Sequence, residues 1–252
     1  FQEVDITGIT EPITKHNFLV KDVRELAETM RKAFEIASSG RPGPVLVDVC
    51  KDATASAVEF EPFDGKKRLN LEIKNLYTAD ELQNAAAAVQ EAKRPVILSG
   101  GGTIIAGVTD LLLSLSEKLH IPVATTLMGT GSVPGSYRLY TGLLGMHGTR
   151  VSNKVVSECD LLINIGARFS DRVISDINRF APKAKIMHID ADPAEINKNV
   201  TVQFALSGNI DQILKGIIDK TEAIPETEWA KTVRNWKEEY KLVFPDDGTL
   251  HP

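Results

Sequence analysis

Glycines follow apolar, strand-like segments at four points of the sequence, where they could bring backbone N–H groups close to a phosphate. In a parallel α/β sheet these points are the carboxyl ends of strands, where ligands bind, and a following helix favours an anion. One glycine at a strand end more often simply ends the strand, but recurrence at four strand ends favours a dinucleotide site. The glycines are Gly100, Gly101, Gly102, Gly129, Gly131, Gly166 and Gly208.

Charged and polar side chains occupy the same kind of position. In "GARFSDR", Arg168 and Arg172 flank a serine and an aspartate just beyond an apolar run. Two guanidinium groups there could pair with a diphosphate or with a substrate carboxylate. The alternative is a surface Arg–Asp ion pair, which contributes little. The segment "IDAD", with Asp190 and Asp192, and the segment "SGN" add oxygen acceptors suited to ribose hydroxyls or to an adenine amine.

Several catalytic signatures are missing from the sequence. The stretch "GGGTIIAG" does not fit the G-x-G-x-x-G fingerprint, so a first βα turn of the NAD-binding kind is not supported. There is no P-loop, no G-x-S-x-G and no Ser-His-Asp signature. His147 in "GLLGMHGTR" is a candidate base, but a single histidine in a glycine-rich loop more often packs or forms hydrogen bonds. The residues themselves therefore predict a dinucleotide site without visible catalytic groups.

Composition narrows the class of protein. The 252 residues are 42% hydrophobic and 25% charged, which is typical of a soluble globular protein. The net charge is -5, and the sequence has no basic stripe of the kind that binds nucleic acids. No apolar run approaches the roughly 20 residues that span a bilayer. Cys50 and Cys159 are not spaced as a metal site or redox pair, and the five histidines are scattered. We expect no metal site, no membrane span and a reduced, cytoplasmic compartment.

The elements that must position these residues follow from hydrophobic periodicity. Apolar residues at helical spacing predict a helix over 20–38, followed by a buried strand at 45–50 and a long surface linker over 51–73. Beyond the linker, helices and strands alternate, which predicts a doubly wound parallel sheet with helices on both faces. The stretch "ETEWAKTVRNWKEEYKLVF" predicts a separate amphipathic helix leading out of the domain. The alternating segments are helices at 79–92, 107–119, 152–159 and 210–219, and strands within 94–103, 121–131, 160–169, 184–192 and 203–209.

Motifs in nearly the whole chain resemble the large, catalytic subunit of acetolactate synthase, also called acetohydroxyacid synthase. The segments "ITKHN", "SGRPGPVLVDVCKD", "TTLMGTG", "LGMHGT", "DLLINIGARFSDRV" and "KIMHIDADPAEINKN" carry the resemblance and occur in the family's order. That family uses thiamine diphosphate and has three domains. The resemblance implies that 1–55 is the tail of the pyrimidine-binding domain, 56–74 a linker and 75–222 a Rossmann-like central FAD-binding domain. Residues 223–252 would be a helix and connector toward a diphosphate-binding domain.

The resemblance also implies an activity and partners. Family members condense two pyruvates, or pyruvate and 2-oxobutyrate, with loss of CO₂ in branched-chain amino acid biosynthesis. They use thiamine diphosphate and Mg²⁺, form dimers or larger homo-oligomers, and can bind a small regulatory subunit. The sequence contains no G-D-G motif and no region with the activating glutamate, so we expect a fragment that is inactive alone and supplies no catalytic residue. Two alternatives stay open: another thiamine-diphosphate enzyme, such as a relative of oxalyl-CoA decarboxylase or glyoxylate carboligase, or a non-catalytic dinucleotide-binding module.

The resemblance assigns two sets of site residues. The flavin in this family is mainly structural, because the net reaction is not a redox reaction. The residues that resemble its contacts are Arg41, Gly100, Gly101, Gly102, Thr126, Leu127, Leu144, Gly145, Met146, His147, Gly166, Ala167, Arg168, Ser170, Arg172, Val173, Asp190, Ala191, Asn209 and Ile210. The residues that resemble the lining of the channel to the thiamine are Phe1, Gln2, Lys51, Met146, Asp171 and Arg172.

Three positions depart from the commoner family pattern. Ser170 and Asn209 stand where aspartate is usual, and Cys50 stands where proline is usual. Serine and asparagine still accept hydrogen bonds but lack the charge, which weakens these two contacts rather than the case for a flavin. The catabolic acetolactate synthases lack FAD and lack the arginine-containing "RF-DR" signature. This chain has the signature, which favours the biosynthetic, FAD-containing branch.

Overall fold

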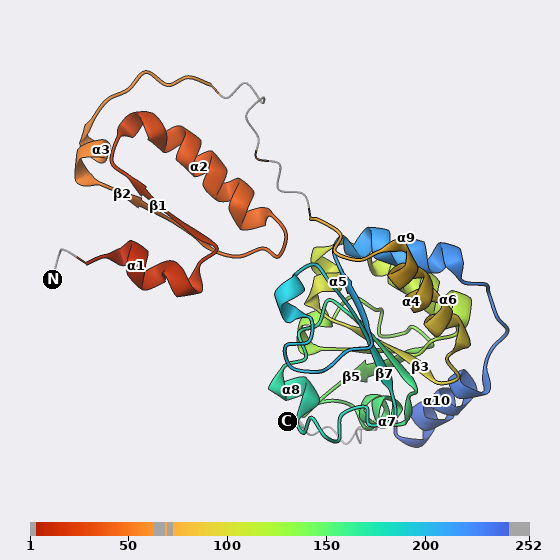
Figure 1. Ribbon diagram of the computed structural model, residues 1–252. Helices are drawn as coiled ribbons and strands as arrows, with labels where there is room; N and C mark the ends of the chain where they lie inside the picture. Colours follow the sequence, from red (N-terminus) through yellow and green to blue (C-terminus); the bar gives the residue numbers. More distant parts are fainter. Residues whose placement is uncertain (1–3, 63–68, 70–72, 242–252) are drawn as a thin grey trace. The chain divides into compact units, whose positions relative to one another are not determined.

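The computed structural model describes residues 4–62, 69 and 73–241 (Figure 1). The chain divides into two compact units, residues 1–73 (unit 1) and 74–252 (unit 2), and each is described by itself. In the part of the chain that is described, no helix has the length and apolar character needed to cross a membrane.

Unit 1 is built around two parallel strands joined by a helix. It contains α1 (Ile6–Thr10), a 3-10 turn (Glu11–Ile13), β1 (His16–Val20), α2 (Val23–Ser38), β2 (Val45–Val49) and α3 (Lys51–Ala55). The Asp22 side chain caps α2 by accepting from the Arg24 N–H, and β1 and β2 pair in parallel. The helix and β2 confirm the prediction. The strand β1 was not predicted, and α3 is a helix where the pattern predicts a linker.

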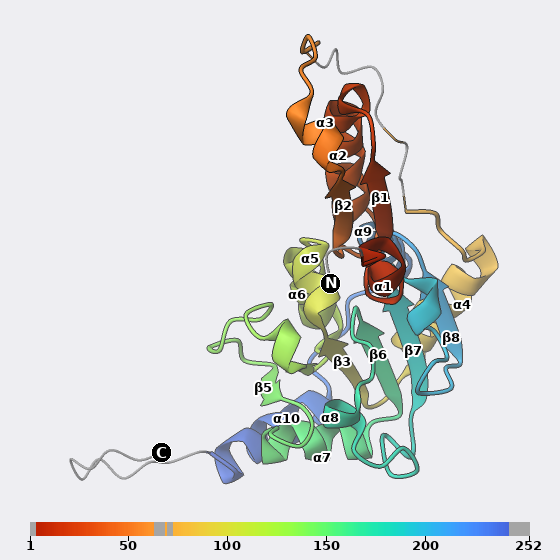
Figure 2. The ribbon, with the colours of Figure 1, turned by 90° about the vertical axis from the view of Figure 1, so that its left-hand side faces the viewer.

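Unit 2 contains a six-stranded sheet in which every pairing is parallel (Figure 2). The spatial order is β5-β4-β3-β6-β7-β8, so the chain starts in the middle, winds to one side and then to the other. This confirms the doubly wound sheet and places the topological switch point between β3 and β6. The strands are β3 (Pro95–Ser99), β4 (Val123–Thr125), β5 (Tyr140–Leu143), β6 (Leu161–Ile165), β7 (Lys185–Asp190) and β8 (Phe204–Ser207).

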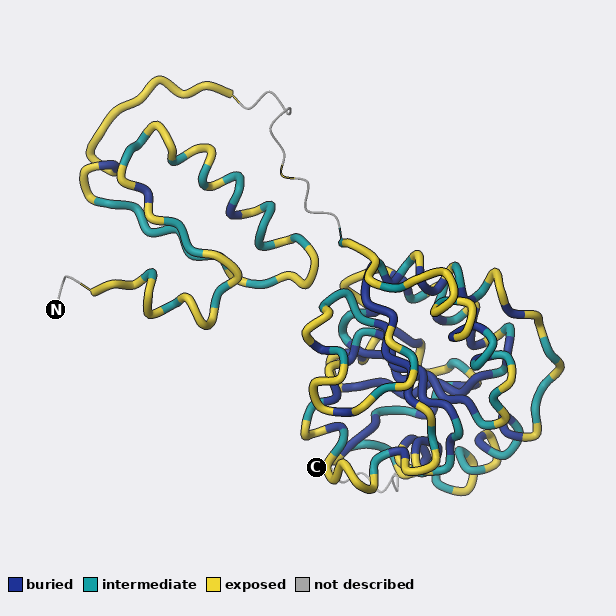
Figure 3. Tube along the Cα trace, in the orientation of Figure 1, coloured by how far each residue is buried: buried dark blue, intermediate teal, exposed yellow. Residues whose placement is uncertain are grey.

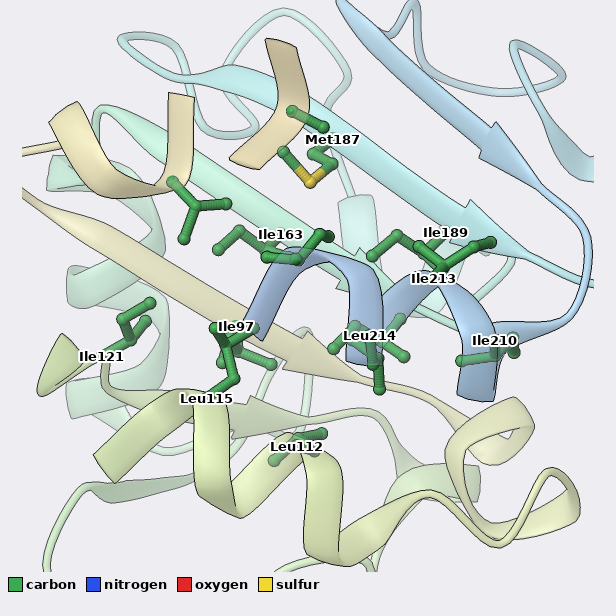
Figure 4. Close-up of a cluster of buried hydrophobic side chains, with 14 of the residues drawn as sticks. Ile97, Leu112, Leu115, Ile121, Ile163, Met187, Ile189, Ile210, Ile213 and Leu214 are labelled. Carbon is green, nitrogen blue, oxygen red and sulfur yellow. The ribbon is translucent and has the colours of Figure 1, made fainter. Parts of the chain in front are cut away.

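Helices cover both faces of this sheet, and the strands between them are buried (Figure 3). The first core contains side chains such as Leu112 and Leu214 packed on Ile97 and Ile163. This packing brings α4, α6 and α9 to one face of the sheet (Figure 4). The second core contains side chains of α7 and α10 against the opposite face. The helices are α4 (Ala79–Glu91), α5 (Gly101–Ile105), α6 (Thr109–Leu119), α7 (Arg150–Glu158), α8 (Asp171–Ile174), α9 (Ile210–Lys220) and α10 (Glu228–Glu239).

The last helix, α10, differs from its prediction as a separate element. Trp229 and Val233 are buried in the second core, and the Trp229 indole N–H donates to the carbonyl oxygen of Pro95 at 3.0 Å. The spacing of its aromatic residues predicts an amphipathic helix correctly. The apolar face of that helix, with Trp229 and Val233, packs on unit 2 and forms part of the second core.

Candidate functional site

The predicted site residues of unit 2 come together at one edge of the sheet. Each of the six strands ends there, and each is followed by a loop or short turn that carries some of them (Figure 2). Parallel strands place all their carboxyl ends on the same edge, which is where ligands bind in doubly wound sheets. The loops that follow the strands are far apart in the sequence but lie side by side in the fold. We call this row of strand ends and loops the carboxyl edge.

At the switch point, the glycines after β3 pack against the glycine after β6. Gly100 N–H donates to the Ile165 carbonyl at 2.9 Å, and Gly102 N–H donates to the Gly166 carbonyl at 3.0 Å. A Cβ on Gly100 would collide with the Gly166 carbonyl oxygen. The geometry differs from the phosphate site expected from the sequence, because these two N–H groups are already used within the protein. The glycines are needed for close packing of two loops.

The turn after β4 presents apolar side chains to solvent. Thr126 is buried, and its hydroxyl accepts from Gly129 N–H at 3.2 Å, so it holds the turn. Leu127 and Met128 are 74% and 75% exposed, and Gly101 lies beside Met128. Two exposed apolar side chains in a row form a surface suited to a flat aromatic ring.

The "GLLGMHGTR" segment contains the end of β5, the loop that follows it and the first residue of α7. Gly145 has a φ of +106°, and the Asn153 side chain accepts from its N–H at 3.2 Å and donates to its carbonyl at 3.1 Å. Met146 N–H donates to the Arg172 carbonyl at 2.9 Å. Leu144 is buried in the second core, whereas Met146 and His147 are exposed. Hydrogen bonds therefore fix the backbone of the loop, while the Met146 and His147 side chains are exposed.

The "GARFSDR" segment follows β6 as a loop and runs into the first residues of α8. Its backbone is held by Asn164, whose side-chain amide donates to the Ala167 carbonyl at 2.5 Å, and Phe169 is buried with a φ of +51°. Arg168 and Arg172 are exposed. The Arg172 Nε lies 3.8 Å from the Asp171 carboxylate, and both side chains are largely exposed, so this ion pair is weak. Ser170 immediately precedes α8, and Val173 is buried.

The ends of β7 and β8 carry the predicted acceptors. The Asp190 side chain is 13% exposed; its Oδ1 accepts from Asp192 N–H at 2.9 Å, and its Oδ2 lies 3.7 Å from His188 Nε2. The Asn209 Oδ1 caps α9 by accepting from Asp211 N–H at 3.0 Å. Ala191 is half-buried, and Ile210 is buried in the first core. Asp190 is the better placed acceptor, because it has a second carboxylate oxygen, Oδ2, whereas the single Asn209 side-chain oxygen accepts from both Asp211 N–H and Gln212 N–H.

The remaining predicted residues lie in unit 1 or outside the described residues. Arg41 is exposed between α2 and β2, and Lys51 is exposed at the start of α3, so both are part of unit 1. Phe1 and Gln2 lie outside the described residues. Across residues 4–62, 69 and 73–241, no three His, Cys, Asp or Glu side chains gather as a possible metal site.

Sequence reasoning missed three residues of this edge. Met128 is exposed beside Leu127, and its position after a strand end was the available signal. Asn153 contacts Gly145, eight residues earlier, and His188 contacts Phe169 in the loop after β6. No local pattern identifies such contacts, because they depend on which strands and loops become neighbours.

Comparison with known proteins agrees with this architecture. Residues 82–217 match the family described as "Thiamine pyrophosphate enzyme, central domain". The whole chain is 44% identical to the probable acetolactate synthase large subunit of Methanocaldococcus jannaschii, covering 44% of that protein. It is 41% identical over 97% of its length to acetolactate synthase isozyme 1 large subunit of Escherichia coli, covering 43% of it. The large subunit of Parasynechococcus marenigrum is 40% identical over the whole chain, which covers 42% of it.

The chain thus spans less than half the length of these relatives. The family match extends from α4 into α9 and includes all six strands of the sheet, whereas α10 lies beyond it. The chain belongs to the thiamine pyrophosphate enzyme family, and residues 82–217 are its central domain.

Proposed function

We propose that this chain is the FAD-binding central part of an acetolactate synthase large subunit. Three relatives with that name are at least 40% identical to it over nearly its whole length. The complete protein would condense two pyruvates, or pyruvate and 2-oxobutyrate, with loss of CO₂. Bound thiamine diphosphate with Mg²⁺ would supply the carbanion chemistry, and most of its site would be formed by parts of the protein beyond this chain.

The observation that carries the FAD proposal is the order of side-chain chemistry along the carboxyl edge. Exposed apolar side chains, Leu127 and Met146, follow β4 and β5 at one end. The exposed guanidinium groups of Arg168 and Arg172 follow β6. The carboxylate of Asp190 ends β7 near the other end of the row.

FAD has the same order of chemical groups. Its ring system is flat and largely apolar, its diphosphate is an anion that arginine binds well, and its adenosine carries hydroxyl and amine donors. Several assigned residues have side chains that face the cores, so they would contact the cofactor through backbone atoms; these are Leu144, Ala167, Val173 and Ile210. The residues present therefore fit FAD, with the ring toward β5 and the adenosine toward β8.

The proposal extends to the surroundings of the site. Arg41 would reach the flavin from the pyrimidine-binding part, residues 1–55, and 223–252 would connect to a diphosphate-binding part. Lys51, Met146, Asp171 and Arg172, with Phe1 and Gln2, would line the channel to the thiamine. We also propose a cytoplasmic homo-oligomer that can bind a small regulatory subunit, as "large subunit" in the names of the relatives suggests.

Two measurements on the complete protein test this function. The purified protein should show flavin absorbance bands, or gain them with stoichiometric binding when FAD is added after removal of the endogenous cofactor. It should also form acetolactate from pyruvate when thiamine diphosphate and Mg²⁺ are supplied, and omission of either is the control. Protein that is folded but never binds FAD would contradict the cofactor proposal, and lack of acetolactate formation would contradict the reaction.

A further inference from the structure

The ends of β6, β7 and β8 contain three buried side chains with polar atoms that have no hydrogen-bond partner among the described residues. These atoms are the Asn164 Oδ1, both ring nitrogens of His188 and the Ser207 Oγ. The strand register sets Asn164 beside His188 and Ser207 beside Asp190. Alternate residues of a strand share a face, so His188 and Asp190 lie on the same side of the sheet. The unpartnered groups therefore lie around Asp190, the side chain that is proposed to accept a hydrogen bond from adenosine.

The His188 imidazole is held in place by packing rather than by hydrogen bonds. The side chain is completely buried, and the Phe169 ring meets it edge-on with ring centroids 5.1 Å apart. Phe169 belongs to the "GARFSDR" loop and has a φ of +51°, a left-handed conformation that is uncommon for an aromatic residue. His188 therefore links the loop that carries Arg168 to the strand that ends in Asp190.

A buried imidazole with two unpartnered nitrogens costs folding free energy, because both atoms lose their hydrogen bonds to water. An apolar side chain of similar size would avoid that cost. Departures from the rule that buried polar groups form hydrogen bonds tend to occur at functional sites. The Asp190 Oδ2 lies 3.7 Å from the His188 Nε2. A shortening of roughly 0.8 Å would make an ordinary N–H···O hydrogen bond.

We propose that His188 is a positioning residue for the adenosine part of a bound nucleotide. When the nucleotide binds, the His188 Nε2 moves within hydrogen-bond distance of the Asp190 Oδ2 and donates to it. This bond fixes the carboxylate, which accepts a hydrogen bond from a ribose hydroxyl or an adenine amine. The Asp190 Oδ1 is already held by Asp192 N–H at 2.9 Å, so the imidazole completes the orientation of the carboxylate. This inference rests on the proposed FAD function and adds a residue that acts through Asp190 without touching the ligand.

The test measures binding of ADP, FMN and FAD to the complete, cofactor-free protein by calorimetry. His188→Leu should weaken ADP and FAD about tenfold, which is about 1.4 kcal/mol, and leave FMN unchanged, because FMN has no adenosine. His188→Gln, which keeps an N–H donor, should recover part of the loss. The thermal midpoint of His188→Leu should equal or exceed that of the parent protein. Met187→Leu, on the same strand but facing the first core, is the matched control and should change neither quantity.

A double-mutant cycle shows whether the effect passes through Asp190. Because His188 acts only through that carboxylate, His188→Leu combined with Asp190→Asn should lose no more ADP affinity than Asp190→Asn alone. Additive losses would overturn the proposal, as would equal weakening of ADP and FMN or unchanged ADP affinity in both His188 variants. A parent protein that binds neither FAD nor ADP would show that the proposed function is wrong, and the assignment of His188 would fall with it.

Discussion

The backbone N–H of Met146 donates to the carbonyl oxygen of Arg172 at 2.9 Å, and the Arg172 guanidinium lies 3.6 Å from the Met146 sulfur. Two loops that follow different strands, β5 and β6, are thereby joined through both backbone and side chains. Each loop carries residues assigned to the flavin and to the substrate channel. A change in one loop should therefore be felt in the other, and Gly145 is the position where this can be tested.

Gly145→Ala should destabilise unit 2 by about 1–3 kcal/mol, since an alanine at positive φ is strained. The φ of Gly145 is +106°, and a Cβ there would collide with the Arg172 carbonyl oxygen. Urea unfolding of the variant measures the loss, and FAD content should fall with it. Gly135→Ala is the control, because a Cβ at Gly135 meets no atom within 4 Å. Equal stability of the two variants would contradict this description of the loop.

The two cysteines should differ sharply in reactivity. Burial raises the pKa of the Cys159 thiol to about 12, and its Sγ lies 3.1 Å from the Val156 carbonyl oxygen. Cys50 is only partly buried. Iodoacetamide at about pH 8, where exposed thiols begin to ionise, should modify Cys50 alone in the folded protein and both cysteines after denaturation. Mass spectrometry of peptides gives the readout, with Cys50→Ser as control. Rapid labelling of Cys159 in the native protein would show that its thiol is accessible to solvent and would contradict this prediction.

The packing of α10 on the sheet is tested at Trp229. Trp229→Ala should cost about 3–5 kcal/mol of unfolding free energy, as for other large buried aromatic residues. Trp229→Phe keeps most of the volume but loses the hydrogen bond to Pro95, at a cost of about 1 kcal/mol. Asn235→Ala, an exposed position in the same helix, should stay within about 0.5 kcal/mol of the parent protein. If the Trp229 variants unfold like the parent protein, α10 does not belong to the core of unit 2.

Long amphipathic helices were predictable because their apolar residues recur at helical spacing. The predicted helices at 79–92, 107–119 and 210–219 correspond to α4, α6 and α9 within two residues at either end. The short strands β1 and β5 were not predicted. Their five and four residues are too few to show a period, and most of their side chains are only partly buried or exposed. Tertiary pairing, rather than local pattern, makes them strands.

The glycines at strand ends predicted the location of the candidate site, but they did not predict which hydrogen bonds their N–H groups form. The location follows from a general property of parallel sheets, whereas the use of each N–H depends on which loops become neighbours. Gly100 and Gly102 have suitable types for a phosphate site, yet their N–H groups bind the backbone of residues 165 and 166. His188 shows the same limit, because only the strand register brings it beside Asn164 and only the fold of the loop after β6 places Phe169 against it.

Stability should fall at high pH through Tyr137. Burial raises the pKa of this phenol to about 12, against about 10 in the unfolded chain, and its hydroxyl lies 2.8 Å from the Ser116 Oγ. The folded state therefore keeps the proton over a range in which the unfolded state releases it. The stabilisation is fully present below about pH 10 and is lost as pH rises toward 12. Unfolding free energy measured from pH 8 to 11 should decline less steeply in Tyr137→Phe. Parallel profiles would contradict the shift.

Arg168 should bind the diphosphate of FAD, since its side chain is exposed at the centre of the carboxyl edge while Asn199 holds its carbonyl at 3.2 Å. A charge-assisted hydrogen bond contributes about 1.5–3 kcal/mol, so Arg168→Ala should weaken FAD and ADP by roughly 10- to 100-fold. Riboflavin has no phosphate, and its affinity should not change. Added salt should reduce the difference between parent and variant, because it screens the ion pair. Arg94→Ala, at the amino end of β3, is the control and should bind FAD normally. If both arginine variants keep full FAD affinity at low salt, the diphosphate does not lie beside β6.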